Sequence, residues 1–137
     1  MSLFVDSSAW YAAADRNDRH NARAKQLLAT EEALVTSDHV LVESWRLLHH
    51  FLRPGAAETF WEGLRSGVAA VEQTIDADLE AARAIGEQFP DQDFSLVDRT
   101  SFALMERLGV LRAISFDDDF AIYRFGRGRK SAFEVLR

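Results

Sequence analysis

The sequence predicts an α/β fold in which a central, mostly parallel sheet of four to five short strands lies between two layers of helices. Short apolar runs alternate along the chain with stretches whose apolar residues recur at the spacing of an α-helix. Strands that alternate with helices form parallel sheets, because each helix returns the chain to the same edge of the sheet. With 137 residues, 47% of them hydrophobic, we expect one domain over residues 1–137 with a buried core.

Composition excludes several classes of protein. The 16 basic and 22 acidic residues give a net charge of −6, so a role in nucleic-acid binding would depend on local positive charge or on a metal. The absence of cysteine excludes disulfides and thiolate metal sites. The N-terminal segment is too short and too acidic for a signal peptide, and no long apolar run follows it. We therefore expect a cytoplasmic protein that does not enter the membrane.

The first half of the chain contains two expected strands and four expected helices. In order, these are strand 3–5, helix 9–15, helix 20–30, strand 33–36, helix 38–51 and helix 56–66. Ser7 and Ser8 are suitable caps for the first helix, and Ser37 or Asp38 for the third. The Pro54-Gly55 pair ends the third helix. Its expected buried stripe consists of Val40, Ser44, Leu47, Leu48 and Phe51.

The second half follows the same alternation. Its expected elements are strand 68–71, helix 76–89, helix 95–108, strand 110–116, a Gly- and Arg-rich loop over residues 123–130 and edge strand 133–136. Asp76 is the expected cap of the first of these helices. Ser95 and Asp98 have the spacing of a capping box for the second, which Gly109 ends.

Acidic residues follow the expected strands. Asp6 ends the first strand, and Asp117 to Asp119 end the strand over residues 110–116. Consecutive acids at the end of a buried strand cost free energy unless something neutralises them. Open parallel sheets bind ligands beyond the carboxyl ends of their strands, where the strand order reverses. If the strands that end at Asp6 and Asp117 are neighbours, both carboxylates face that crevice, and Glu43 and Asp98 lie on helices near the same edge.

This acidic set has a functional interpretation and a local one. The candidate ligands are carboxylates, with no cysteine and no suitably spaced histidine pair, so they suit Mg²⁺ or Mn²⁺ better than Zn²⁺. A water molecule bound to such an ion becomes more acidic and attacks phosphodiesters. Locally, Asp98 is a capping acid, Asp6 a turn or cap residue and Glu43 a solvated helix residue, while residues 117–119 form a polar loop. The sequence alone leaves both interpretations open.

Four segments in order resemble the PIN-domain nucleases, and among them the VapC-type toxins of bacterial toxin–antitoxin pairs. They are LFVDSSAW, TSDHVLVE, FSLVDRTSFALMERLG and SFDDDF. The resemblance extends over essentially the whole chain and implies a three-layer α/β/α PIN-like fold. It implies a Mg²⁺- or Mn²⁺-dependent endoribonuclease that cleaves RNA, is inhibited by a cognate antitoxin protein and forms a homodimer. The implied site consists of the catalytic and metal-binding acids Asp6, Glu43, Asp98 and Asp117, with Asp119 as a further ligand and Ser7 and Ser95 in support.

Three arginines of the loop over residues 123–130 are candidates for contacts with RNA phosphates. They are Arg124, Arg127 and Arg129, and the neighbouring glycines would let backbone N–H groups approach a phosphate. The alternative is a solvated loop.

Two other functions fit parts of this pattern. One is a non-catalytic PIN-like module that binds RNA or protein, and the intact set of four acids argues against it. The other is a phospho-accepting receiver domain. It would need paired acids after the first strand, but Asp6 is flanked by Val5 and Ser7.

Overall fold

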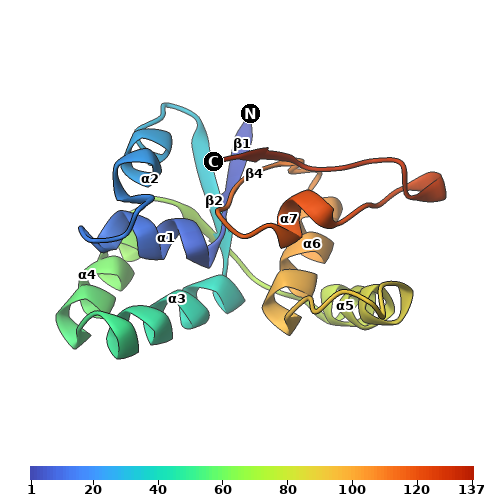
Figure 1. Cartoon of the computed structure of the whole chain (residues 1–137), viewed down its shortest axis with the longest axis horizontal. Coiled ribbons are helices and arrows are strands. Elements are labelled where there is room, and N and C mark those ends of the chain that lie inside the picture. The colour runs from blue at the N-terminus through green and yellow to red at the C-terminus, as the bar shows by residue number, and fades with distance from the viewer.

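A five-stranded parallel sheet lies at the centre of the computed structural model, which describes residues 1–137 (Figure 1). The strand order is β3-β2-β1-β4-β5, and every neighbouring pair is parallel. The strands are β1 (Ser2–Val5), β2 (Ala33–Ser37), β3 (Ala70–Glu72), β4 (Arg112–Ile114) and β5 (Glu134–Leu136). The predicted α/β architecture is confirmed, and the sheet is entirely rather than mostly parallel.

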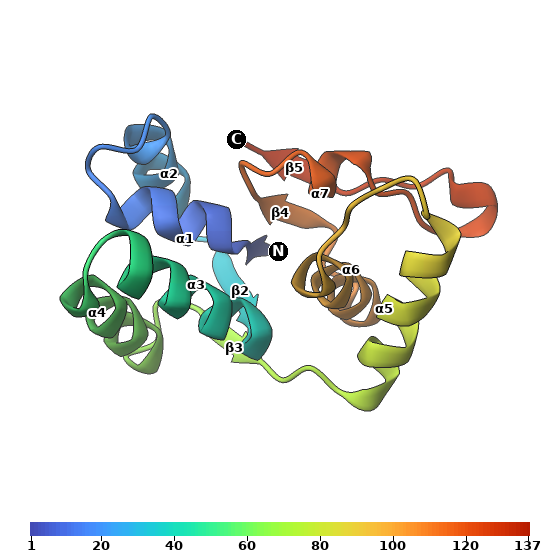
Figure 2. The same cartoon turned by 60° about the horizontal axis from the view of Figure 1, so that its bottom comes forward.

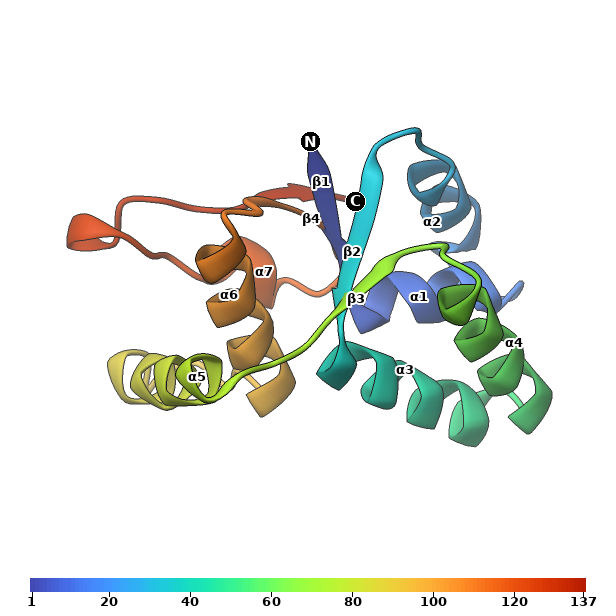
Figure 3. The ribbon, with the colours of Figure 1, turned by 180° about the vertical axis from the view of Figure 1, so that it is seen from behind.

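Helices cover both faces of the sheet. The first four lie on one side and the remaining three on the other (Figures 1 and 3). They are α1 (Ser7–Ala14), α2 (Asn21–Leu28), α3 (Asp38–Phe51), α4 (Pro54–Arg65), α5 (Asp76–Gln88), α6 (Leu96–Leu108) and α7 (Asp119–Ile122). A short 3-10 turn, Arg127–Arg129, follows α7. At the carboxyl edge of the sheet α3 and α6 come into contact, as Figure 2 shows from another side.

The central strand β1 is buried on both faces. Leu3 is 2% exposed, and Phe4 and Val5 are not exposed at all. On the side of α5 to α7, the ring of Phe4 stacks on Phe120 and that of Phe120 meets Phe102 edge-on, with centroids 6.2 Å and 4.9 Å apart. Continuous burial explains why β1 reads as an uninterrupted apolar run.

The strand order reverses at β1. The chain leaves β1 towards β2 on one side and returns beside it as β4 on the other. The backbone N–H of Asp6 donates to the carbonyl of Ile114 at 3.1 Å, so the two strands stay paired up to the point where both end. The expectation that the strands before Asp6 and Asp117 are neighbours is confirmed, which makes their carboxyl ends the topological switch point.

Three helix starts differ from the predictions. The N-cap of α1 is Asp6, not Ser7 or Ser8, and its carboxylate accepts from the Ser8 N–H. The N-cap of α5 is Ile75 rather than Asp76, because Asp78 reaches back to the Ile75 N–H. Helix α4 begins at Pro54, which occupies its first turn, where a missing N–H costs nothing.

One strand is displaced and another is shorter than predicted, because the first residue expected in each strand instead hydrogen-bonds to the end of the preceding helix. The N–H of Val68 bonds the Gly63 carbonyl at the end of α4, and the N–H of Val110 bonds the Met105 carbonyl at the end of α6. Strand β3 therefore covers Ala70–Glu72 instead of 68–71, and β4 covers Arg112–Ile114 instead of 110–116.

Two further corrections concern residues outside the sheet. Residues 119–122 form α7, where no helix was expected. Phe51, placed in the buried stripe, is 66% exposed, because α3 ends there and turns away into α4.

One ion pair joins α5 to α6. The guanidinium of Arg107 donates from Nε and Nη2 to the two carboxylate oxygens of Asp78, both at 2.9 Å. The Asp78 side chain is only 2% exposed, whereas that of Arg107 keeps 33% of its surface in solvent. Burial raises the pKa of Asp78, but the Arg107 hydrogen bonds and the Ile75 N–H outweigh it, so the pKa lies below its ordinary value.

None of the helices is long and apolar enough to cross a membrane.

Candidate active site

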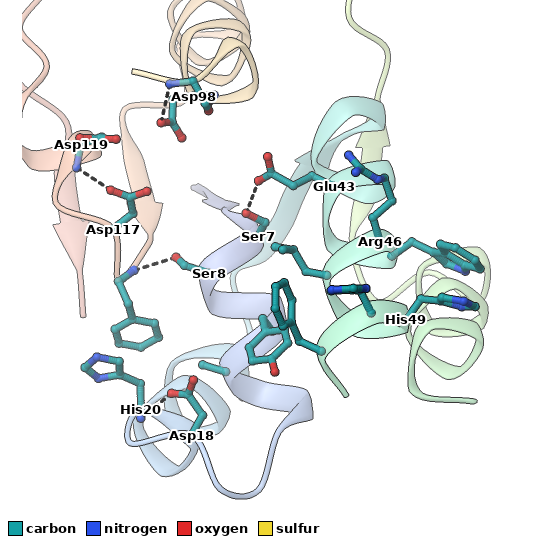
Figure 4. A pocket seen from close by; sticks show the side chains of 18 of the residues that line it. Ser7, Ser8, Asp18, His20, Glu43, Arg46, His49, Asp98, Asp117 and Asp119 are labelled. Carbon is teal, nitrogen blue, oxygen red and sulfur yellow. Dashed lines mark hydrogen bonds between the residues drawn. The ribbon is translucent and has the colours of Figure 1, made fainter. Parts of the chain in front are cut away.

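A cleft of about 1310 Å³ lies at the carboxyl edge of the sheet. Its walls come from the first turns of α1, the length of α3, the start of α6 and the segment after β4 (Figure 4). Asp98, Asp117 and Asp119 lie at one end of the cleft and Asp18 at the other, whereas Arg46 and His49 of α3 lie on the wall opposite Asp117.

The tightest group of acids comes from two segments. Asp98, Asp117 and Asp119 each present a carboxylate oxygen within 4.8 Å of the others. Asp98 lies in the first turn of α6, and the other two follow β4. A turn holds those two together, because the Asp119 N–H donates to Oδ1 of Asp117 at 2.9 Å.

Asp6 lies behind this group and is 2% exposed. Its Oδ2 accepts from the hydroxyls of Ser8, at 2.8 Å, and Ser115, at 3.0 Å. Burial raises the pKa of Asp6 to about 6, although the two serine hydroxyls and the Ser7 N–H oppose the shift and the charge of Asp117 adds to it. Asp6 is thus a fixed, desolvated carboxylate next to the acid group.

Asp98 completes the capping box of α6 and also belongs to the tight group of acids. Its Oδ2 accepts from the Ser95 N–H at 3.1 Å, and its own N–H donates to the Ser95 hydroxyl at 3.0 Å, which completes the predicted capping box. Burial, the neighbouring Asp119 carboxyl and the charges of Asp6 and Asp117 raise the pKa of Asp98 to about 8. The helix start therefore fixes a carboxyl that is costly to ionise.

Glu43 reaches the cleft from the opposite wall. The hydroxyl of Ser7 donates to its Oε1 at 2.5 Å, so the start of α1 orients the carboxylate, as Figure 4 shows. Glu43 and Asp6 are not among the three acids of the tight group. Asp98, Asp117, Asp119 and Glu43 line the cleft, and the buried Asp6 lies behind them.

The acid group suits a divalent cation with a preference for oxygen. Its donors are carboxylate oxygens alone, which match Mg²⁺ or Mn²⁺. Burial, followed by the charges of neighbouring acids, also raises the pKa of Asp119. A cation between these groups would offset the repulsion and favour their ionised forms.

Sequence reasoning missed Ser115 as part of the site. Its hydroxyl donates to Asp6 and accepts from the Asp117 N–H at 3.1 Å, so it links the two strand ends. Ser8 was expected only as a cap, yet its hydroxyl also accepts from the Phe116 N–H at 3.0 Å. A serine inside an apolar strand was the only signal for Ser115, and it does not identify a partner.

The arginine loop lies away from the cleft. It extends past the end of α5, on the far side of the molecule from α1 and α3 (Figures 1 and 2). Arg124 donates to backbone carbonyls at the end of α7, the closest being that of Ala121 at 2.6 Å. The guanidinium of Arg129 lies 5.0 Å from the centre of the Phe89 ring.

The parallel sheet with carboxylates at its switch point has the architecture that the resemblance of the four sequence segments to the PIN-domain nucleases implies. The PIN domain model matches residues 3–126, and the chain belongs to the PIN domain family.

Relatives and solved structures agree with this assignment. Over 125 residues the chain is 38% identical to the 23S rRNA-specific endonuclease VapC20 of two Mycobacterium tuberculosis strains, covering 90% of this chain and 95% of that protein. The crystal structure of M. tuberculosis VapC20, described as a sarcin-ricin loop cleaving toxin, superimposes with a TM-score of 0.83 at 34% identity, covering 88% and 93% of the two chains. The fold alone is shared with the DNA-bound VapBC2 of Rickettsia felis, with a TM-score of 0.70, 9% identity and coverage of 99% and 98%.

Proposed function

We propose that this protein is a Mg²⁺- or Mn²⁺-dependent endoribonuclease and the toxin of a toxin–antitoxin pair. The observation that carries the proposal is the group formed by Asp98, Asp117 and Asp119, whose carboxylate oxygens lie within 4.8 Å of one another at the switch point of a PIN fold. A non-catalytic binding module has no need for carboxylates that repel one another.

In this proposal the tight acid group holds the ion, and Asp6 and Glu43 complete its surroundings. A bound divalent ion supplies an acidified water and stabilises negative charge on the phosphate. Glu43 accepts a hydrogen bond at one oxygen only, so its other oxygen remains available to orient water, whereas both oxygens of Asp6 accept from serine hydroxyls. Ser95 fixes the Asp98 carboxyl through the capping box, which limits its motion before the ion binds.

We propose 23S rRNA as the substrate. The support is VapC20, which is 38% identical over 90% of this chain and is named for that activity. Sequence-specific recognition of RNA usually targets unpaired loops, and an open cleft of this size admits an unpaired strand.

The metal dependence has a direct test. Purified protein with Mg²⁺ or Mn²⁺ should cut 23S rRNA at one position in a primer-extension assay, and excess EDTA should stop the reaction. Restoring either ion after EDTA should restore the cut, which excludes damage by the chelator. Cleavage at an unchanged rate in EDTA would contradict the metal mechanism, and metal-dependent cleavage confined to another RNA would contradict only the proposed substrate.

The proposed partners are a cognate antitoxin and a second copy of the chain. The aromatic residues and exposed side chains along α3 would receive an amphipathic antitoxin segment. Expression of the protein alone should arrest growth, and co-expression with the antitoxin should restore it.

We keep as a separate proposal that Arg124, Arg127 and Arg129 contact RNA outside the cleft. If they do, neutralising all three should flatten the salt dependence of RNA binding by up to about 0.7 in log–log slope per lost contact. The matched control is a triple variant of Arg16, Arg23 and Arg83, which are equally exposed. A slope equal to the wild-type slope would show that the loop is solvated and makes no phosphate contacts.

A further inference from the structure

Two rings form a stacked pair on the wall of the cleft. The imidazole of His20 and the ring of Phe116 are nearly parallel, with centroids 4.4 Å apart and an interplanar angle of 6°. Both residues line the cleft and are half-buried rather than enclosed in the core. Phe116 directly precedes Asp117 in the chain, so the pair lies next to the acids.

The hydrogen bonds that fix Asp6 also fix Phe116, whereas His20 is held by its own neighbours in the chain. The Phe116 N–H donates to the Ser8 hydroxyl, which donates to Asp6. The backbone N–H of His20 donates to Asp18, while Arg19 donates to Nε2 of its ring at 3.1 Å. Although His20 is the N-cap of α2, its side chain makes no capping hydrogen bond. Neither helix capping nor burial in the core therefore explains why an imidazole lies at this position.

The opposite wall repeats the arrangement. Trp45 and His49 of α3 stack with centroids 4.8 Å apart and an interplanar angle of 18°, and both line the cleft. Trp45 lies close to Glu43 in the same helix. The acids of the cleft repel the phosphates of RNA, whereas the uncharged faces of the bases meet no such repulsion, so stacking on them is a means of binding RNA there.

We propose that the His20–Phe116 pair is a stacking site for an unpaired RNA base next to the phosphate that is cut. Aromatic rings bind single-stranded RNA in this way because every base presents a π-face. The proposal rests on the proposed endoribonuclease function, because it takes the acids as the place of cleavage. It adds a subsite that orients the strand without touching the reacting atoms.

The test uses two variants and two measurements. Phe116→Leu removes one ring while keeping an apolar side chain, and His20→Ala removes the other from the turn between α1 and α2, which carries none of the acids of the tight group. A short unpaired oligoribonucleotide with 2-aminopurine beside the cleaved position should lose fluorescence on binding the wild-type protein and keep it with either variant. In Mg²⁺, KM should rise by about 5- to 100-fold with kcat little changed, the pattern of lost uniform binding.

Trp61→Leu is the matched control, because Trp61 is 44% exposed on α4 and does not line the cleft. It should leave both readouts at wild-type values. If the wild-type protein cleaves but both variants keep its KM and its fluorescence change, the stacking site is disproved while the proposed function stands. If the protein never cleaves yet both rings are needed for the fluorescence loss, the function fails and the base-binding site stands. No fluorescence loss with the wild-type protein would overturn the site.

Discussion

Replacing Asp98 with Asn should reduce RNA cleavage on the order of 10²–10³-fold, the usual cost of losing one electrostatic contact to a transition state. The substitution keeps an oxygen that can accept the Ser95 N–H, so the capping box of α6 survives. It removes one of the three carboxylates of the tight acid group. A single-turnover assay at saturating Mn²⁺ measures the effect, with Asp91→Asn, an exposed acid outside the cleft, as the control.

The same variant should be at least as stable as the wild-type protein without metal. The pKa of Asp98 is raised to about 8 in the folded state, so folding at pH 7 bears the cost of a carboxyl that the unfolded chain ionises freely. This cost in folding free energy disappears as the pH falls below the pKa of Asp98 in the unfolded chain, which is about 4. The stability advantage of Asp98→Asn should therefore shrink towards that pH. Added Mn²⁺ should raise the melting temperature less than in the wild-type protein, because weaker binding stabilises less. An Asp98→Asn protein that cleaves RNA at the wild-type rate would remove this residue from the site.

The second large effect concerns stability rather than cleavage. Arg107→Met should lower the free energy of unfolding by about 2–3 kcal/mol, because it leaves the buried Asp78 carboxylate without its charged partner. The loss is smaller than the ~3–5 kcal/mol of a fully buried pair, since one third of the Arg107 side chain is in solvent. Urea denaturation at pH 7 measures it.

The control is Arg83→Met on α5, whose ion pair with Glu87 is 79% and 71% exposed and should cost less than about 1 kcal/mol. The pKa of Asp78 is depressed, so the contribution of the pair is present above the unfolded pKa and is lost as the pH falls through the folded one. The difference between Arg107→Met and the wild-type protein should therefore narrow in acid. A difference that persists unchanged at pH 2 would show that packing by the arginine, not its charge, stabilises the α5–α6 contact.

The fold was predictable because its strands and helices differ in periodicity, but the element boundaries were not. Val68 and Val110 look like strand residues, yet each donates its N–H to the end of the preceding helix. Such caps depend on how the chain turns at Gly67 and Gly109, both of which have positive φ. The apolar pattern is the same whether a valine extends a strand or closes a helix.

The candidate site was predictable for a different reason. The sequence places Asp6 and Asp117 at strand ends, and the pairing of β1 with β4 brings them to one edge of the sheet. The link through Ser115 and the stacking of His20 on Phe116 join residues that are far apart in sequence. No periodicity marks such pairs, and they emerge only from the packed structure.

Two of the acids at the site also begin helices. Asp6 is the N-cap of α1, and Asp98 completes the capping box of α6, so replacing either by a side chain that cannot accept a hydrogen bond would weaken a helix as well as the cleft. A descendant that had given up nuclease activity would still be under selection to keep both. The Glu43 side chain caps no helix, because its only hydrogen bond is the one from the Ser7 hydroxyl. Across related chains, the identity of the residue at position 43 should therefore distinguish active enzymes from inactive descendants better than the two aspartates do.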